Sequence, residues 1–206
     1  VFQPELRRLL EQLGKGTFFA PSLNQESQRD GWEMLAREIS DAAAVLSRNR
    51  VGALIVLQRH NDIEEYLESG VKLDAQVSSR LLINIFVPNT PLHDGAVVIS
   101  QGRIDRAAAF LPLSTNPLLD KELGTRHRAG IGISEVSDAI VVIISEETGT
   151  ISTAVGGKLN RYLDAAALKE WLTREIVYPE RESSSWWRRR WDDNGNRAEQ
   201  TEDHRS

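Results

Sequence analysis

The run Val51–Leu57 constrains the fold more than any other stretch of this 206-residue sequence. It is short, apolar and rich in β-branched side chains, which is typical of a strand that is buried on both faces. We therefore predict a central strand here. Gly52 and Ala53 at its start leave room for a bulky group against the backbone, although small residues there would serve helix packing equally well.

The patterns on either side of this run predict an α/β fold. Apolar residues at helical spacing, with caps and breakers at their ends, predict helices over residues 1–13, 32–49, 61–69, 78–86 and 164–177. Runs that flank short turns predict two β-hairpins, residues 96–100 with 104–111 and 139–145 with 150–155. The semi-apolar segment 71–75 is predicted to be a linker that covers a ligand. These elements indicate a central mixed β-sheet with flanking helices.

Three segments are expected along the chain. Residues 1–14 form an amphipathic helix, residues 15–179 form a single domain, and residues 180–206 form a polar, disordered tail. The tail contains Trp186–Trp191, in which three arginines lie between tryptophans. Such a cluster could lie at an anionic membrane surface, stack on nucleic acid, or simply be packed or solvated.

Composition excludes several classes of protein. The formal net charge of −5 argues against a protein that coats nucleic acid. The absence of cysteine excludes disulfides, thiolate zinc sites and cysteine nucleophiles, and it fits a reducing cytosol. No apolar run reaches the roughly 18 residues of a membrane-spanning helix, so we expect this chain to be soluble. Because it begins at Val1 without a signal-peptide pattern, we also expect a preceding segment to have been removed.

The stretch Asn89–Ala96 places an acid at a tight turn. Pro91 fixes a backbone torsion, and Gly95 permits a conformation or a close ligand approach that a side chain would block. Asp94 should therefore lie on a rigid corner that leads into the strand beginning at Ala96. Such a corner could hold a metal ion, although Asp-Gly pairs are also common in ordinary turns.

A group of cations follows about thirty residues later, in Leu123–Gly130. Arg126 and Arg128 carry planar donor groups suited to phosphate oxygens, and Gly124 lets backbone N–H groups approach the same anion. Taken alone, the two arginines would more often begin a solvated helix. In combination with Asp94 they predict a carboxylate, metal and polyphosphate site.

Several familiar catalytic motifs are absent from the sequence. Gly130-Ile131-Gly132 lacks the third glycine and the preceding strand of a dinucleotide fingerprint, and residues 156–159 lack the spacing of a P-loop. No Gly-x-Ser-x-Gly elbow occurs, and the four histidines form no His-x-x-x-His pair. A serine hydrolase and a zinc hydrolase are therefore disfavoured.

The motifs together resemble one known family, the diadenylate cyclases, which make cyclic di-AMP from ATP. The matching stretches are Gly-Ala-Leu-Ile-Val at 52–56, Thr-Pro-Leu-His-Asp-Gly-Ala at 90–96, Gly-Thr-Arg-His-Arg-Ala at 124–129 and Ser-Glu-Glu-Thr-Gly at 145–149. Phe-Gln-Pro-Glu-Leu-Arg at 2–7 further resembles the membrane-associated bacterial branch, in which it follows three transmembrane helices. The likeness covers residues 2–177 and implies a location at the cytoplasmic face of the cell membrane for the full-length protein.

The resemblance also implies roles for individual residues. By analogy, Asp94 binds Mg²⁺ or Mn²⁺ and helps to activate the 3′-hydroxyl of ATP, with His93 and Glu147 as further metal-site candidates. The triphosphate would be held by Thr125, Arg126, His127 and Arg128, beside Gly124. The remaining nucleotide contacts implied by the motifs are Gly52, Ala53, Leu73, Asp74, Ala75, Gly95 and Ala96.

Catalysis in this family is expected to need a head-to-head homodimer, because each protomer holds one ATP and each 3′-hydroxyl attacks the α-phosphate of the other. At Phe110 some relatives carry a tyrosine near the base, so a hydroxyl contact is absent here. Two other functions stay open at this point. One is a regulatory module that binds ATP without turnover, and the other is a structural domain that docks through the Trp/Arg tail.

Overall fold

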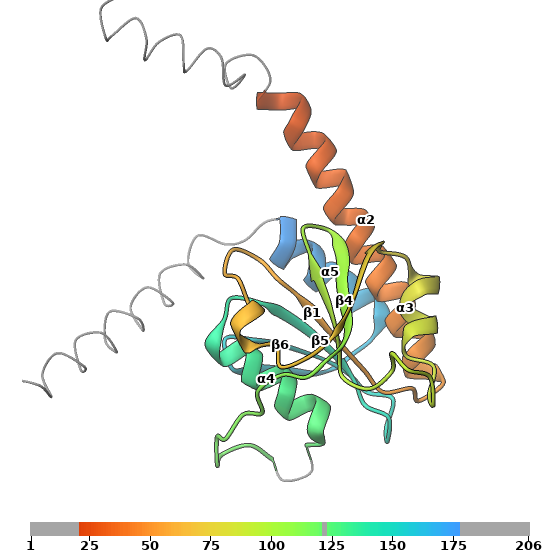
Figure 1. The fold of residues 1–206 in the computed structure, drawn as a ribbon. Helices are drawn as coiled ribbons and strands as arrows, with labels where there is room; N and C mark the ends of the chain where they lie inside the picture. The colour runs from red at the N-terminus through yellow and green to blue at the C-terminus, as the bar shows by residue number, and fades with distance from the viewer. Residues whose placement is uncertain (1–20, 121–122, 178–206) are drawn as a thin grey trace, which may run out of the picture.

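The computed structural model describes residues 21–120 and 123–177 (Figure 1). The predicted helix over residues 1–13 and the predicted tail from residue 180 lie outside these ranges. The described elements, in chain order, are α2 (Pro21–Arg48), β1 (Ala53–Leu57), the 3₁₀ turn η1 (Glu64–Tyr66), β2 (Val71–Gln76), α3 (Ser79–Ile85), β3 (Ala96–Ser100), β4 (Arg103–Ala109), α4 (Thr125–Val136), β5 (Ile140–Ile144), β6 (Ile151–Val155), β7 (Lys158–Leu163) and α5 (Ala165–Val177).

Seven strands form one mixed sheet in the order β2-β4-β3-β1-β5-β6-β7. β1 lies in the middle, parallel to β3 and antiparallel to β5, and all five of its residues are buried. The predicted central strand and the mixed α/β fold are thus confirmed.

Two apolar cores lie on opposite faces of this sheet, and β1 contributes to both. Ala53, Ile55 and Leu57 face a core shared with α2, α3 and α5, whereas Leu54 and Val56 face a core shared with α4. Alternate residues of a strand point to opposite faces, so a strand between two helical layers must be apolar at every position. Figure 1 shows α2 and α3 on one side of the sheet and α4 on the other.

The helix predicted over residues 32–49 is longer than expected. α2 begins at Pro21 and ends at Arg48, so residues before the predicted start at Trp32 are already helical. The buried stripe begins only at Leu35, which is why hydrophobic periodicity located the packed half of the helix and missed the part before it. Figure 1 shows that the N-terminal part of α2 extends beyond the sheet.

Two predictions between β1 and α3 were wrong. The helix expected over residues 61–69 is only the 3₁₀ turn η1, because the backbone then bonds to the end of β4, with Glu68 N–H donating to the carbonyl of Phe110. The expected linker 71–75 is strand β2, which pairs antiparallel with β4 at the edge of the sheet. Its exposed and half-buried residues gave it the composition of a loop.

Both predicted hairpins are confirmed, as β3–β4 and β5–β6, but, in addition to β2, strand β7 and helix α4 were not predicted. Gly156 and Gly157, expected to end the second hairpin, form a left-handed turn that leads into β7. α4, expected at most as a helix start, runs for 12 residues. The helix predicted over 78–86 is present as α3, and its N-cap Ser78 accepts a hydrogen bond from Leu81 N–H.

Candidate active site

A pocket of about 790 Å³ opens where five parts of the fold meet. These are the start of β1, the corner before β3, the chain after β4, the first turn of α4 and the turn between β5 and β6, and β7 adds one side chain. The predicted site residues that line it are Asp94, Gly95, Gly124, Thr125, Arg126, His127 and Glu147. The structure therefore brings the predicted acid and part of the predicted cation cluster into one cavity.

The corner that carries Asp94 is built as the sequence indicates. Gly95 has φ +105°, and a Cβ there would lie 2.8 Å from the carbonyl oxygen of Ala109 on β4. The close approach that requires glycine is thus made by the protein's own backbone. Upstream, Thr90 Oγ1 donates a 2.7 Å hydrogen bond to the carbonyl of Val87. This hydrogen bond stabilises the turn before Asp94.

His93 lies on the same turn, but it does not line the pocket. Its Nδ1 is 2.6 Å from the carbonyl oxygen of Thr90. Because a carbonyl can only accept, Nδ1 must carry the proton, which leaves Nε2 of the neutral ring as a lone-pair donor. This arrangement is typical of metal-binding histidines.

The first turn of α4 presents backbone N–H groups to the pocket. The N-cap is Gly124, whose lack of a side chain leaves the helix end without a side-chain cap. The first N–H groups of a helix have no intrahelical partner and attract anions. α4 is held in place by close packing, since a Cβ at Gly132 would lie 2.1 Å from the carbonyl oxygen of Pro112.

Arg126 is paired with a carboxylate across the pocket wall. Its Nη1 lies 2.5 Å from Oε2 of Glu146, and a Cβ at Gly52 would come within 2.7 Å of the same Nη1. The space beside Gly52, which was expected near the nucleotide, is therefore taken by this ion pair. Arg126 Nε is buried and has no hydrogen-bond partner among the described residues.

His127 is only 6% exposed, and its Nε2 likewise has no partner among the described residues. Burial lowers the pKa of His127, and the positive charge of Arg161 lowers it further, while Glu147 partly opposes the change. The ring is therefore neutral at pH 7, because even its unperturbed pKa of about 6.5 lies below that pH. A neutral imidazole in the pocket can donate or accept a hydrogen bond, but it adds no charge.

Other predicted site residues lie outside the pocket lining. Ala53 and Ala96 are fully buried in the two cores, and the backbone of Arg128 bonds to Gly124 and Ser114. The residues on β2, expected to contact the base, are Leu73, Asp74 and Ala75.

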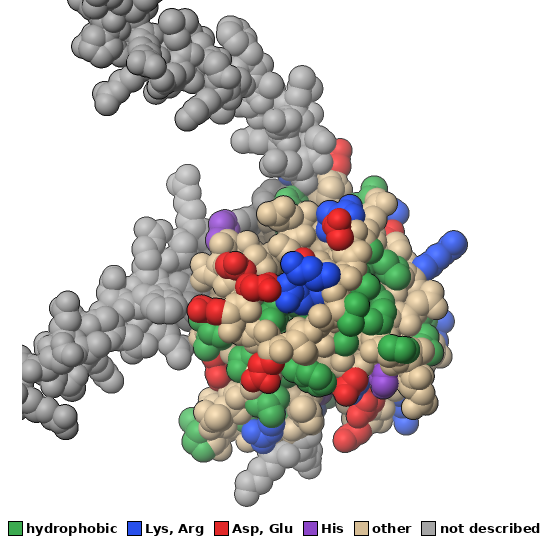
Figure 2. Space-filling model, in the orientation of Figure 1, with side chains coloured by type: hydrophobic (Ala, Val, Ile, Leu, Met, Phe, Trp, Pro, Cys, Tyr) green, Lys and Arg blue, Asp and Glu red, His purple; other side chains and the backbone are tan. Residues whose placement is uncertain are grey.

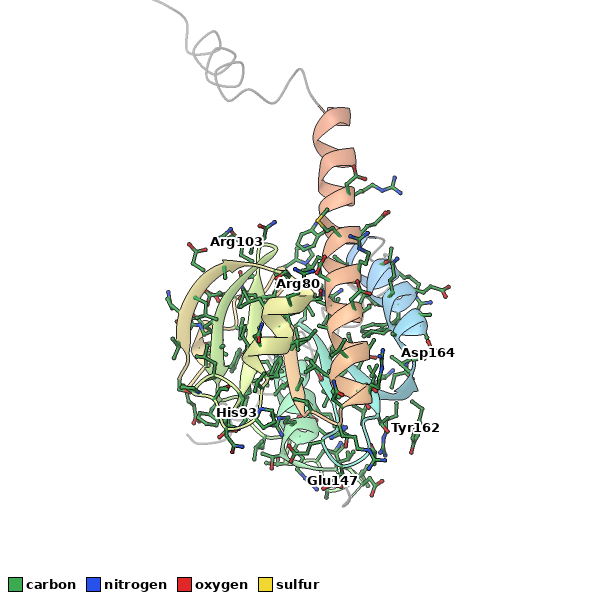
Figure 3. The ribbon with its side chains drawn as sticks, turned by 90° about the vertical axis from the view of Figure 1, so that its right-hand side faces the viewer. Arg80, His93, Arg103, Glu147, Tyr162 and Asp164 are labelled. Atoms are coloured by element: carbon green, nitrogen blue, oxygen red, sulfur yellow. The ribbon has the colours of Figure 1, made fainter. Side chains whose placement is uncertain are left out.

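Asp74 is engaged elsewhere on the sheet. Its Oδ1 accepts a 2.6 Å hydrogen bond from Arg103 Nε. Figure 3 shows Arg103 at the opposite end of the sheet from His93 and Glu147. A nucleotide contact from β2 remains a prediction.

Two charged residues of the pocket, Glu146 and Arg161, were not predicted as site residues. Glu146 belongs to the matching stretch at 145–149, but it was given no role in the site. Arg161 was missed together with its strand, although the alternation of Leu159, Arg161 and Leu163 after Gly156-Gly157 is a strand pattern. An apolar wall that includes Phe110 and Leu113 completes the cavity.

The fold and the pocket define a class of protein, an α/β domain in which an uncapped helix end lies beside an acidic corner. The family described as "DisA bacterial checkpoint controller nucleotide-binding", abbreviated DAC, matches residues 40–159, which is more than half of the chain. The chain therefore belongs to the diadenylate cyclase family of nucleotidyltransferase-type enzymes.

Individual relatives agree with this assignment. The chain is 49% identical to the cyclic di-AMP synthase CdaA of Bacillus subtilis, over 91% of this chain and 69% of that protein. It is 48% identical to a diadenylate cyclase of Listeria monocytogenes, over 86% of this chain and 64% of that protein. The chain thus spans about two thirds of the length of these relatives.

Two solved structures share the fold. A double mutant of DacA from Staphylococcus aureus matches with a TM-score of 0.67 and 46% identity, covering 71% of this chain and 97% of that one. A hypothetical membrane spanning protein from Bacillus cereus matches with a TM-score of 0.60 and 45% identity, over 61% of this chain and 62% of that one.

Proposed function

We propose that this chain condenses two ATP molecules into cyclic di-AMP and two pyrophosphates, each 3′-hydroxyl attacking the α-phosphate of the other nucleotide. The observation that carries the proposal is that Asp94 and the uncapped N-terminus of α4 face the same pocket. A phosphoryl-group transfer needs little more than positioning and charge stabilisation, and these two features supply both.

The triphosphate binds at the first turn of α4. The N–H groups after Gly124 meet phosphate oxygens, Thr125 adds a hydroxyl, and Arg126 exchanges Glu146 for the nucleotide. In that exchange Arg126, which is 23% exposed, keeps an anionic partner, and Glu146, which is 63% exposed, returns to solvent. Arg128, two residues after Arg126 and outside the pocket lining, is assigned to the same phosphates by the family motif alone.

The chemical types of the candidate donors, carboxylate and imidazole, suit Mg²⁺ or Mn²⁺. The candidates are the carboxylates of Asp94 and Glu147 and Nε2 of His93, although within the described ranges no three His, Asp or Glu side chains gather closely enough to form a metal cluster. Mg²⁺ is commonly held by one or two carboxylates with substrate phosphates completing its shell. The ion would supply charge stabilisation at the phosphates and acidify the attacking hydroxyl.

The protein's own groups then position the reaction. Asp94 is held by the hydrogen-bonded turn that precedes it. Its carboxylate accepts a hydrogen bond from the 3′-hydroxyl and then takes the proton as the hydroxyl attacks. His127, neutral and buried beside the phosphates, donates or accepts a hydrogen bond according to its tautomer. Arg126 offsets the negative charge that develops on the departing pyrophosphate.

We further propose that two copies of the chain meet head to head, since one pocket supplies one acid and one phosphate site. Phe110 and Leu113 support this arrangement, because both line the pocket and are 49% and 50% exposed. A second protomer would bury part of this apolar surface.

We also propose a membrane tether in the longer protein, at the cytoplasmic face of the membrane. Among the described residues no helix has the length and apolarity to cross a bilayer. The support is instead the likeness to CdaA and to the membrane spanning protein of Bacillus cereus. α2, which extends from the sheet at its N-terminal end, would connect the domain to such a tether.

Nucleic acid is not an expected partner. On the face drawn in Figure 2, basic side chains occur in small groups with acidic side chains near them, rather than as one continuous basic surface. The net charge of −5 points the same way.

The test is to incubate the chain with ATP and either Mn²⁺ or Mg²⁺ over a range of protein concentrations and to identify the products by mass spectrometry. We expect cyclic di-AMP and pyrophosphate, with specific activity rising as dimers form. ATP that binds but returns unchanged at every concentration would instead favour the regulatory module.

A further inference from the structure

Arg161 is a cation of the pocket that the family motifs do not include. It lies on β7, two residues after Leu159, which packs in the core beneath α4. Alternation along the strand therefore directs Arg161 toward α4 as well. Its side chain reaches the pocket and lines it together with Arg126 and His127.

The guanidinium of Arg161 is only loosely engaged by the protein. Its Nη1 is 3.8 Å from Oδ2 of Asp120, which is too long for a hydrogen bond. Its central carbon lies 5.1 Å from the ring centre of Tyr162, a residue that is itself 77% exposed. Its Nε is buried and has no partner within the described part of the chain.

Arg126 provides the contrast on the same pocket wall. Its guanidinium is 2.5 Å from Glu146, so an anion must displace a carboxylate to reach it. A buried donor without a partner is costly, and an anionic ligand would remove that cost at Arg161. Both arginines that line the pocket have a buried Nε without a partner in the described part of the chain, so the difference between them is the carboxylate. Arg126 is hydrogen-bonded to Glu146, whereas among the described carboxylates Arg161 has only the 3.8 Å contact with Asp120, which leaves its donors open to a ligand.

The order of the strands indicates which part of a nucleotide Arg161 meets. β4, whose end carries Phe110 and the apolar wall, is the second strand of the sheet, and β7 is the seventh. The first turn of α4 lines the pocket between the two. If the base of a nucleotide lies against the apolar wall at the end of β4, its phosphates lie at the first turn of α4. The terminal phosphates then point toward β7.

We infer that Arg161 binds the terminal phosphates of the nucleotide and, after transfer, the pyrophosphate. This inference rests on the proposed function for the identity of the nucleotide. It assigns the recognition of a triphosphate, as opposed to a monophosphate, to a residue of β7. A guanidinium is well suited to this task because its planar donors can contact two phosphate oxygens together.

The test compares Arg161→Gln and Arg161→Lys with the unchanged chain in binding to three probes, measured by calorimetry with Mg²⁺. The probes are α,β-methylene-ATP, inorganic pyrophosphate and AMP. We expect Arg161→Gln to lower the affinity for the ATP analogue and for pyrophosphate by about tenfold or more, and the affinity for AMP by no more than about twofold. The losses in Arg161→Lys should lie between those of Arg161→Gln and the unchanged chain. Equal affinity for the ATP analogue, or an equal loss for AMP, would overturn the inference.

Two further variants exclude indirect explanations. Arg174→Gln removes an exposed arginine of α5, outside the pocket, and should change none of the affinities. Asp120→Asn removes the carboxylate near Arg161 and should leave binding of the analogue unchanged. If Asp120→Asn reproduces the loss, Arg161 acts by holding the loop that contains Asp120, and the inference is wrong. Melting temperatures show whether each variant is folded.

The outcomes separate this inference from the proposed function. A chain that binds the analogue through Arg161 but forms no cyclic di-AMP would contradict the proposed function alone. A chain that forms cyclic di-AMP while Arg161→Gln binds normally would contradict the inference alone. If the unchanged chain binds neither the analogue nor pyrophosphate, both are wrong.

Discussion

The two faces of the sheet are built differently. The face covered by α2, α3 and α5 is closed by aliphatic side chains such as Ile39 and Leu172, both fully buried. The other face is closed by α4, and the five buried side-chain atoms without a hydrogen-bond partner among the described residues all belong to α4, β6 and β7. Both faces thus have an apolar core, but four of these five atoms, on Arg126, His127, Ser152 and Arg161, lie on the α4 face, whereas Thr153 alternates with Ser152 and faces the other core. The unmet polar groups that a ligand could satisfy are concentrated on the α4 face.

The largest expected effect is on the apolar face. Ile39→Ala should lower the free energy of unfolding by about 2–4 kcal/mol, because it removes buried methyl groups and leaves a cavity. Urea denaturation would measure this loss, with Met34→Ala, on an exposed side chain of the same helix, as the matched control. ATP affinity of the folded protein should not change, and a large loss of affinity would break the division between the faces.

The complementary change on the α4 face is Arg126→Gln. It should weaken ATP binding by about tenfold, since a charge-assisted hydrogen bond is lost, while stability changes little. Calorimetry and urea denaturation on one preparation would measure both quantities. A variant that loses stability and keeps its affinity for ATP would contradict the assignment of Arg126 to ligand binding.

A smaller effect is expected from Glu146→Gln. Because Glu146 competes with the nucleotide for Arg126, the variant should bind ATP more tightly, by a factor of about two to five. Titration with ATP in the absence of turnover measures it. Weaker binding would mean that Glu146 orients Arg126 for the nucleotide instead of competing for it.

The smallest effect concerns pH. The pKa of His127 is lower in the folded protein than the unfolded value of about 6.5, so the unfolded state binds more protons. Stability should therefore fall as pH decreases from about 6.5 through the folded pKa. His127→Gln should flatten this part of the profile of melting temperature against pH. An unchanged profile in His127→Gln would contradict the burial argument.

The sequence predicted those parts of the fold that depend on local pattern. β1 and both hairpins have the composition of buried strands, and the turn around Asp94 follows from Pro91 and Gly95. The edge strands β2 and β7 escaped prediction because they are partly exposed and owe their form to pairing with β4 and β6. Their composition resembles that of loops.

The site was predictable to a similar degree. Asp94 and the first turn of α4 belong to continuous motifs, and the structure places both at the pocket. The pairing of Arg126 with Glu146 joins residues 20 positions apart, and Arg161 reaches the pocket from a strand that pattern did not reveal. Contacts between distant segments depend on the packing of α4 against the sheet, which local sequence does not encode.

The most direct test of the account is Asp94→Asn, compared with Asp41→Asn on the exposed surface of α2. Each variant would be incubated with ATP and Mn²⁺, cyclic di-AMP quantified by mass spectrometry, and ATP affinity and melting temperature measured alongside. We predict that Asp94→Asn loses synthesis by about 100-fold or more while it stays folded and still binds ATP, and that Asp41→Asn behaves as the unchanged chain. Near-normal synthesis by Asp94→Asn would contradict the central claim.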